Sequence, residues 1–297
     1  MYRKNQKLTV FLFLLPSLLL FFGILIWPII QSVHHSFYEY PAFNRAGQFV
    51  GFGNYVKLFS ELYDFGLAIR NALILAALSV FIQLPLSLGL ALMLGKGIKG
   101  ERFYLSVYFM PVLISAVVIG MLWEKIYNPL YGLLTKSFEF FGWADVLPAA
   151  GVLGDKKTAL MAVFIPTIWQ YVGYHMLLMY AGVKGVSSEL REAAKLDGAT
   201  DWQVNRYVVI PCIKPIIKVS IIFAITGSLK SYDLIKVFAG DAYNCPYKVP
   251  SLMLVRYAFN NAGGVASAIA VMLIIMCFGF ALLINWLFKE RNPYGAK

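Results

Sequence analysis

The sequence predicts an all-α membrane protein with about six spanning helices, and two observations support that prediction. Of the 297 residues, 60% are hydrophobic and only 14% are charged, whereas soluble domains average about 45–50% apolar and about 25% charged residues. The apolar residues also gather into runs of about 20 residues or more, the length that a helix needs to cross a bilayer. A water-facing surface needs more charge than this chain has, so lipid is the expected solvent.

The six expected spans follow one another along the chain, and residues 1–297 are expected to form a single transmembrane domain. The approximate bounds of the spans are residues 8–33, 71–94, 103–127, 158–183, 216–238 and 266–288. The first run follows a short basic tail, but it exceeds the apolar core of about 7–15 residues in a signal peptide, so we expect it to be retained. Prolines are expected to loosen three spans, because proline removes a backbone hydrogen bond; they are Pro85, Pro111 and Pro166.

The distribution of lysine and arginine predicts the orientation. These residues are more frequent between the second and third spans and between the fourth and fifth spans than in the segments that alternate with them. Because cytoplasmic loops are enriched in lysine and arginine, both termini are expected in the cytoplasm. The net charge of +11 is spread over these short clusters, so it does not indicate nucleic-acid binding. The outer segments 37–69 and 128–157 are rich in aromatic residues, which favours short interfacial helices.

No cofactor, metal or catalytic site is expected in this chain. The cysteines are far apart and without metal-type spacing, namely Cys212, Cys245 and Cys277. The histidines are not grouped with carboxylates either; they are His34, His35 and His175. The nearest look-alike of a phosphate-binding loop is Gly89 with residues 95–97, but its spacing is too long and a required Ser or Thr is replaced by Gly97. We interpret residues 95–97 as the end of a spanning helix.

The segment of residues 187–211, between the fourth and fifth spans, is expected to be a helix–turn–helix beneath the membrane. Ser187 or Ser188 can cap its first helix, with acidic residues in the first turns. Gly198 then stops or bends the chain, as glycine after a helix commonly does. A second helical stretch over residues 199–209 follows. It is closed by two prolines, Pro211 and Pro215.

This segment resembles the EAA loop of the permeases of ABC importers. The shared pattern is Glu-Ala-Ala at 192–194, glycine at 198 and Val-x-Ile-Pro at 208–211. With Asp197 and Ala199, it is similar to the sugar-uptake subgroup. Residues 49–55, 108–111 and 264–268 also resemble segments of the maltose- and glycerol-phosphate-type permeases, so the likeness covers most of the chain. Residues 239–244 depart from a glycine-rich run that is common in sugar permeases, which leaves the particular substrate open.

The resemblance implies a type I ABC importer permease fold in a bacterial cytoplasmic membrane. Such a permease pairs with a homologous second permease or, alternatively, with a second copy of itself. Two separate ATPase subunits bind ATP and Mg²⁺ and grip the EAA loops, so this chain would be non-catalytic. An extracytoplasmic solute-binding protein delivers the substrate, expected to be a carbohydrate and in particular an oligosaccharide, with uronate oligomers and glycerol phosphate left open. The implied ATPase-docking residues are Glu192, Ala193, Ala194, Asp197, Gly198 and Ala199.

Polar and aromatic residues inside the fourth and fifth spans are the candidate substrate contacts, because polar groups within a membrane are costly and therefore functional candidates. Aromatic faces combined with amides suit sugar rings, which are apolar on the face and polar at the rim. The alternative is that these residues join helices to a partner subunit. Lys230 can also pair with Asp233 if both lie on one helix face. The candidate contacts are Trp169, Gln170, Tyr171, Tyr174, Tyr232 and Asp233, with His175 as a further polar residue of the fourth span.

Two other classes of protein fit parts of the sequence. An ion-coupled secondary transporter would also be a bundle of spanning helices with buried polar groups, but it needs no helical docking loop of this form. A membrane enzyme would need His, Asp or Glu clustered near one face, and no such cluster is evident in the sequence. The secondary transporter therefore stays the alternative to an importer that works by binding its substrate differently in two conformations.

Overall fold

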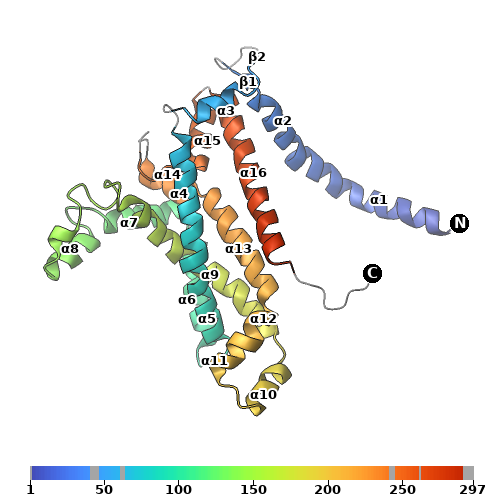
Figure 1. The fold of residues 1–297 in the computed structure, drawn as a ribbon, viewed down its shortest axis with the longest axis vertical. Helices are drawn as coiled ribbons and strands as arrows, with labels where there is room; N and C mark the ends of the chain where they lie inside the picture. Colours follow the sequence, from blue (N-terminus) through green and yellow to red (C-terminus); the bar gives the residue numbers. More distant parts are fainter. Residues whose placement is uncertain (1, 41–46, 61–63, 241–244, 261, 290–297) are drawn as a thin grey trace. The chain divides into compact units, whose positions relative to one another are not determined.

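The computed structural model describes residues 2–40, 47–60, 64–240, 245–260 and 262–289, and helices dominate it (Figure 1). These residues group into two compact units, which we describe in turn. The first unit is Met1–Phe65 with Met253–Ile275, and the second is Gly66–Leu252 with Met276–Lys297. The expectation of one permease domain is not decided by this grouping and stays a prediction.

The first unit begins with a long, continuous helix built from α1 (Tyr2–Leu20), the π-helix η1 (Phe21–Ile26) and α2 (Trp27–Ser36). A short antiparallel ribbon follows, β1 (Tyr38–Glu39) with β2 (Gln48–Phe49), and then α3 (Gly53–Leu58). The Asn54 side chain donates to the Ser36 carbonyl at 2.8 Å and to the Tyr38 carbonyl at 2.9 Å. It thereby fixes the turn from the long helix into the ribbon.

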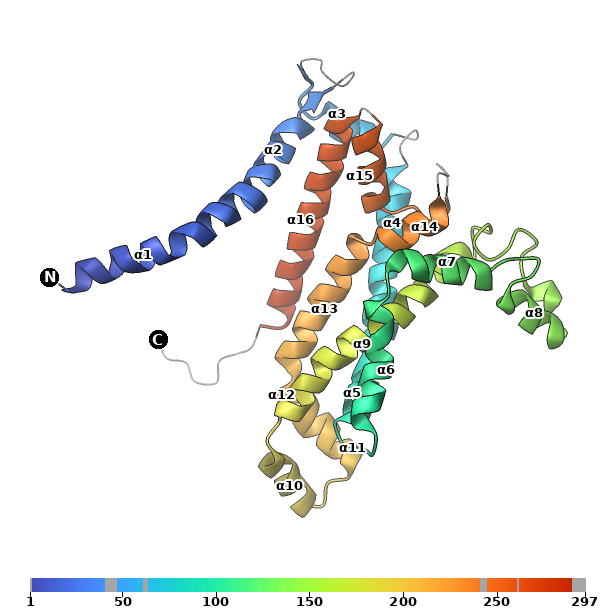
Figure 2. The ribbon, with the colours of Figure 1, turned by 180° about the vertical axis from the view of Figure 1, so that it is seen from behind.

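The second unit contains most of the remaining helices, which Figures 1 and 2 show from opposite sides. Its first spanning helix is α4 (Phe65–Leu78), the π-helix η2 (Ser79–Gln83) and α5 (Leu84–Leu94). The others, in order, are α6 (Glu101–Leu113), α7 (Ala116–Ile126), α8 (Leu133–Phe140), η3 (Ala144–Val146), α9 (Ala159–Gly185), α10 (Ser188–Leu196), α11 (Asp201–Val204), η4 (Asn205–Val209), α12 (Ile210–Cys212), α13 (Lys214–Leu229) and α14 (Asp233–Ala239). Two further helices each contribute residues to both units, namely α15 (Pro250–Phe259) and α16 (Gly263–Leu287).

Helix α9 is the centre of the second unit and packs against α5, α6 and α13 (Figure 2). Its approach to α6 depends on Gly173, since a Cβ at this position would lie 1.8 Å from the Tyr108 carbonyl oxygen. Small residues allow membrane helices to approach this closely. The apolar core beside this crossing consists of Leu84, Ala91, Leu94, Met176, Met179 and Ala224.

Three helices in the described part of the chain are long and apolar enough to cross a membrane, and up to five spans result if each of two bent helix pairs is one span. The three are Thr9–Ser36, Phe65–Leu94 and Gly263–Leu287. They agree with the first, second and sixth expected spans, with ends that differ from the expected ones by up to six residues. The fourth expected span is the 27-residue helix α9, which is long enough but has a polar middle around Gln170 and His175. The count of six spans therefore stays a prediction.

The third expected span is bent, and the helix of the fifth expected span is interrupted. Helix α6 continues through Pro111, ends at Leu113 and meets α7 at 93°. In the fifth region α13 ends at Leu229 and α14 begins at Asp233. Lys230 and Asp233 consequently do not share a helix face, and the pair expected between them is not among the ion pairs of the described residues. That expectation was wrong because the helix ends between the two residues.

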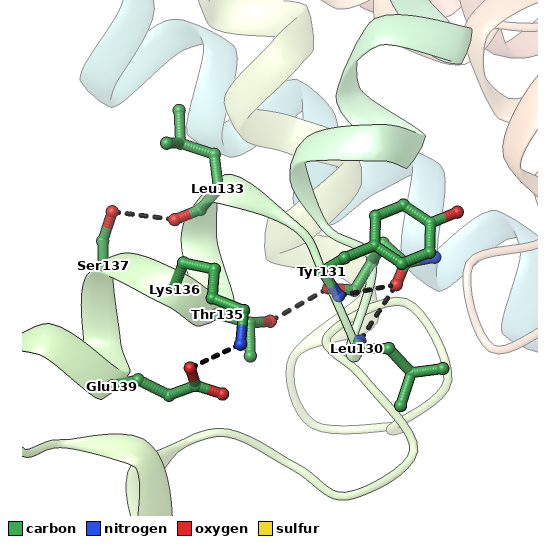
Figure 3. A network of polar contacts seen from close by, with 8 residues as sticks. Leu130, Tyr131, Leu133, Thr135, Lys136, Ser137 and Glu139 are labelled. Carbon is green, nitrogen blue, oxygen red and sulfur yellow. Dashed lines mark hydrogen bonds and ion pairs between the residues drawn. The ribbon is translucent and has the colours of Figure 1, made fainter.

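The segment after α7 forms a turn and the short helix α8 (Figure 3). Hydrogen bonds of Asn128 hold the turn and the start of α8 together. The Asn128 side-chain oxygen accepts hydrogen bonds from the backbone N–H groups of Leu130 at 2.9 Å and Tyr131 at 3.2 Å. The Thr135 hydroxyl donates to the Asn128 carbonyl at 3.0 Å. This segment exposes several aromatic side chains, as an interfacial helix does; they are Tyr131, Phe140, Phe141 and Trp143. In the other outer segment, residues 41–46 and 61–63 lie outside the described residues.

Candidate functional site

A pocket of about 360 Å³ in the second unit brings together most of the candidate substrate contacts. Its walls come from η2, α9, the end of α13 and the start of α14, with Ala116 at the start of α7. Trp169 does not line it and instead packs edge-on against Trp123, with ring centroids 6.2 Å apart. The candidate contacts that line the pocket are Gln170, Tyr171, Tyr174, Tyr232 and Asp233.

The contribution of α9 to the pocket follows helical periodicity. Positions 167, 170, 171, 174 and 175 all line the pocket, and their spacing of i, i+3, i+4, i+7 and i+8 defines one face of an α-helix. We call this set the pocket face of α9. Trp169 lies outside this face, so the prediction that it contacts the substrate has only its residue type in support. The same periodicity, applied to the sequence, would have added Thr167, left out Trp169 and placed His175, already noted as a polar residue of this span, on the same face.

The pocket lies where two helices are interrupted. Because α6 ends at Leu113, the carbonyl of Ile114 is free of a helical partner, and the Gln170 amide donates to it at 3.5 Å. Backbone groups freed inside a membrane need such partners, since no water is available there. The pocket also borders the start of α14 and the π-helix η2 through Ser79 and Gln83. Interrupted helices and π-helical turns are both frequent at the functional sites of proteins.

His175 is the residue whose environment most strongly indicates a ligand. Its side chain is only 4% exposed, and its Nδ1 atom has no hydrogen-bond partner among the described residues. The imidazole packs edge-on against Tyr174, with ring centroids 5.2 Å apart. A buried polar atom without a partner costs about 1–3 kcal/mol, and His175 lines the pocket, so a ligand hydroxyl there would provide the missing hydrogen bond.

The rest of the pocket combines aromatic rings with one positively and one negatively charged side chain. Tyr171, Tyr174 and Tyr232 supply the rings, and Lys230 and Asp233 supply one ammonium and one carboxylate group. The chemistry suits a solute with apolar faces and many hydroxyl groups.

The helix–turn–helix expected between the fourth and fifth spans is present as α10 and the helical segment that begins with α11. The Ser187 hydroxyl caps α10 by accepting from the Glu189 N–H at 3.2 Å. At the other end, Gly198 has φ of +85°, and the N–H groups of Gly198 and Ala199 each donate at 3.0 Å to carbonyls in the last turn. This is a Schellman motif, which requires a residue that tolerates positive φ.

The second helical segment differs from the expected bounds. It begins at Asp201 after Thr200, which forms a capping box with Gln203. It then continues through η4 and α12 to Cys212, and the chain turns at Ile213. Pro211 therefore lies inside the helical segment rather than closing it at residue 209, because the first turn of a short helix tolerates proline. Residues 95–97 end α5 as expected, with Gly95 as its last capping residue.

The two alanines of the Glu-Ala-Ala pattern face different surroundings. Ala194 and Ala199 pack against a buried apolar cluster, whereas Glu192 and Ala193 are exposed. The cluster is formed by Val183, Val204, Val209 and Ile213. Large apolar side chains of the same segment are also exposed, which is typical of a protein interaction surface; they are Leu190, Leu196 and Trp202, the last two by 89% and 67%.

Ion pairs attach this loop to the neighbouring turn. Asp201 pairs with Lys195 at 3.1 Å and with Lys96, which follows α5, at 3.2 Å. Hydrogen bonds from Lys195 and Lys96 hold the pKa of the Asp201 carboxyl below its ordinary value. The Arg191 guanidinium donates to the Val183 carbonyl at the end of α9. The loop is thus connected to two of the helices above it.

Leucine substitutions at Ala193 and Ala194 should affect the stability of the chain differently. Ala194→Leu is expected to destabilise the chain by about 1–3 kcal/mol, because it adds methylene groups to a packed cluster. Ala193→Leu is expected to change the free energy of unfolding by less than about 0.5 kcal/mol, since its side chain faces outward. Thermal unfolding of the detergent-purified chain measures both. Equal losses of stability in the two variants would contradict the assigned faces.

Comparison with known proteins places the chain in a family. Residues 83–291 match the family described as the binding-protein-dependent transport system inner membrane component. The chain is 33% identical to the probable ABC transporter permease protein YurN of Bacillus subtilis, over 96% of this chain and 98% of that one. It is 31% identical to the diacetylchitobiose uptake system permease protein NgcF of Streptomyces coelicolor, over 94% of this chain and 82% of that one.

A solved structure shows the same fold. It is that of a bacterial alginate ABC transporter in complex with an alginate pentasaccharide-bound periplasmic protein, with a TM-score of 0.81 and 23% identity over 96% of this chain and 95% of that one. The fold and the family match together define a permease of an ABC transporter. The chain belongs to the family of inner-membrane components of binding-protein-dependent transport systems. The expected membership of the ABC importer permeases is thereby confirmed.

Proposed function

We propose that this chain is one of two permease subunits of a bacterial ABC importer and that it passes a carbohydrate, in particular an oligosaccharide, across the cytoplasmic membrane. The observation that supports this most is the gathering of five candidate contacts and His175 around one pocket. Its volume of about 360 Å³ lies within the range of about 300–1,000 Å³ for small-ligand sites. The relative NgcF is named for diacetylchitobiose uptake, which agrees with a sugar-type solute.

In this proposal the chain crosses the membrane six times with both termini in the cytoplasm, α9 being one of the spans. It binds no cofactor and has no catalytic residue, because ATP and Mg²⁺ belong to two ATPase subunits. Its other partners are a homologous second permease, an extracytoplasmic solute-binding protein and lipid. The exclusion of nucleic acid follows from the spread of its basic residues over short membrane-flanking clusters.

The loop of residues 187–211 is the proposed contact with an ATPase subunit. Glu192 and Ala193 would meet that subunit directly, with Leu196 and Trp202 beside them, since all four are exposed. Ala194 and Ala199 would act indirectly by holding the loop on its apolar cluster. Asp197 and Gly198 form the turn between the helices. This division refines the docking set that the motif implies.

The proposed mechanism is alternating access. Closure of the ATPase pair on ATP would move the docked loops. The ion pair with Lys96 would pass that movement to the end of α5, the Arg191 hydrogen bond to α9, and the apolar cluster to the start of α13. The pocket lies between α9, α13 and interrupted helices, so a small rotation of these elements would change which side it opens to. The energetic requirement is that the solute binds the two conformations with different affinities.

His175→Phe tests the pocket. Because replacing an unpartnered buried polar group by an apolar ring of similar shape is nearly neutral or stabilising, the thermal unfolding temperature is expected to stay the same or rise. The KM for uptake should rise about 3- to 10-fold, because a hydrogen bond worth about 0.5–1.5 kcal/mol is lost. Uptake of labelled oligosaccharide by vesicles that contain the complete complex measures KM.

Trp169→Phe is the matched control, since Trp169 lies on the same helix but off the pocket, and its KM should not change. An unchanged KM in His175→Phe would contradict a role of the pocket in the solute pathway.

The same vesicles also distinguish an ABC importer from the alternative, an ion-coupled secondary transporter. Uptake should stop when ATP is withheld and continue when ionophores collapse the ion gradients; the reverse pattern would contradict an ABC importer.

A further inference from the structure

A second cavity in the same unit is lined by basic residues. It measures about 340 Å³, and its lining residues come from the first turns of α13 and from the end of α16 with the two residues after it. Three of its six lining residues are lysines and none is acidic. The lining residues are Lys214, Pro215 and Lys218 from α13 with Asn285, Phe288 and Lys289 from α16 and the residues that follow it. We call this the basic cavity.

The positive charge of the basic cavity is not neutralised within the described part of the chain, where none of its lysines forms an ion pair. Lys214 lies over the Phe288 ring, 5.9 Å from the centroid. Lys214 and Lys218 are four residues apart, so like charges face each other along α13. They also lie at the start of α13, where the positive end of the helix dipole disfavours cations. An anion in the cavity would relieve both of these unfavourable effects.

The cavity lies at the depth of lipid headgroups. Helix α16 is one of the three helices that can cross a membrane, and its 25 residues extend about 37 Å, compared with about 30 Å for the hydrocarbon core. Trp286, one residue before its end, is 70% exposed, and tryptophan concentrates at the membrane–water interface. The edge of the hydrocarbon core is therefore expected near the end of α16, at Asn285, Phe288 and Lys289. Glu290 and Arg291 follow in the sequence and lie outside the described residues.

We propose that the basic cavity binds the phosphate of an anionic phospholipid. The ammonium groups and the Asn285 amide would donate hydrogen bonds to the non-ester phosphate oxygens, and Phe288 and Pro215 would pack against the glycerol and first acyl carbons. Basic cavities between membrane helices are suited to such headgroups. Free phosphate offers the same oxygens but no acyl chains, so the lipid is expected to bind more tightly. The inference requires only a membrane-embedded chain and is independent of the solute and of the ATPase.

Lipid binding by the full-length chain in a neutral detergent tests the proposal. Native mass spectrometry would follow titration with phosphatidylglycerol, phosphatidylcholine or inorganic phosphate. Phosphatidylglycerol should bind, and the double variant K214Q/K218Q should bind it about 25-fold more weakly, because each lysine near an anionic headgroup contributes roughly fivefold. The variant K214R/K218R should retain binding, since guanidinium groups also hold phosphate.

The matched control is K99Q/R102Q, which removes the same charge from the turn before α6 and from its first helical turn and should leave phosphatidylglycerol binding unchanged. Equal weakening in this control would mean that net charge alone attracts the lipid and would overturn the proposal. So would equal binding of phosphatidylcholine, or displacement of the lipid by inorganic phosphate at similar concentration. Unchanged lipid binding in K214Q/K218Q together with lost binding of the ATPase subunit would assign the cavity to a protein contact and likewise overturn it.

Discussion

Replacing Gly173 with alanine is expected to prevent stable packing of α9 on α6. The new Cβ would lie 1.8 Å from the Tyr108 carbonyl oxygen, and the obstacle is backbone, so no side-chain rotation can relieve it. The two helices must separate by more than an ångström and lose contacts along their whole crossing. We expect a loss of more than about 4 kcal/mol in the free energy of unfolding, at the upper end for a single substitution.

Gly185→Ala is the matched control for this substitution. Gly185 ends the same helix, and a Cβ there would meet nothing within 4 Å. Alanine favours helix over glycine by about 0.5–1 kcal/mol, so this variant should be unchanged or slightly more stable. Membrane yield and thermal unfolding in detergent compare the two. Similar behaviour of both variants would show that α6 and α9 do not approach as closely as described.

Replacing Glu192 with lysine is expected to abolish assembly with the ATPase subunits while leaving the chain folded. Glu192 is exposed in the middle of α10 and forms no ion pair among those of the described residues, so its reversal disturbs no contact within the unit. At a desolvated interface, truncating one partner of a charge pair costs about 2–5 kcal/mol. Co-purification of the ATPase and ATP-dependent uptake should therefore fall about 30-fold or more.

Glu139→Lys is the corresponding control on another short, exposed helix, α8, which the predicted topology places on the opposite side of the membrane. Its reversal removes the exposed pair with Lys136 at 2.7 Å, which contributes about 0–1 kcal/mol, and should leave ATPase binding intact. A compensating Lys→Glu or Arg→Glu change in the ATPase subunit should restore Glu192→Lys. Normal assembly of Glu192→Lys would exclude Glu192 from the docking surface.

The elements that could be predicted from the sequence are those that a local motif or a periodic pattern of apolar residues determines. The first, second and last expected spans are continuous apolar runs, and their ends agree with those of three long helices to within six residues. The turn at Gly198 was also predictable, because the Schellman motif needs a residue that tolerates positive φ. The pocket face of α9 was present in the sequence as a helical spacing of polar and aromatic residues. Trp169 was misplaced because that spacing was not applied.

The breaks were not predictable, because tertiary contacts determine them. The bend after α6 falls at Ile114 and Ser115, where neither residue is a glycine or proline, and Pro111 lies three residues inside the helix. At the bend, the side-chain amide of Gln170, which is distant in sequence, donates a hydrogen bond to the Ile114 carbonyl that the end of the helix leaves without a backbone partner. The pocket is formed by these breaks, so its existence could not be inferred even though several of its lining residues could.

The π-helix η2 has a consequence for how related sequences align. A π-turn contains one residue more than an α-turn, so the buried face of the helix from Phe65 to Leu94 shifts by one sequence position across the turn. Deleting one residue between Ser79 and Gln83 would restore an ordinary helix and leave Leu84 and Leu94 in their cluster with Met176, because the π-turn already absorbs the extra residue. Deleting one residue from α4 or α5 would instead rotate the helix beyond it by about 100°. A single-residue gap between related sequences is therefore compatible with the same packing at this turn, and not in the α-helical parts.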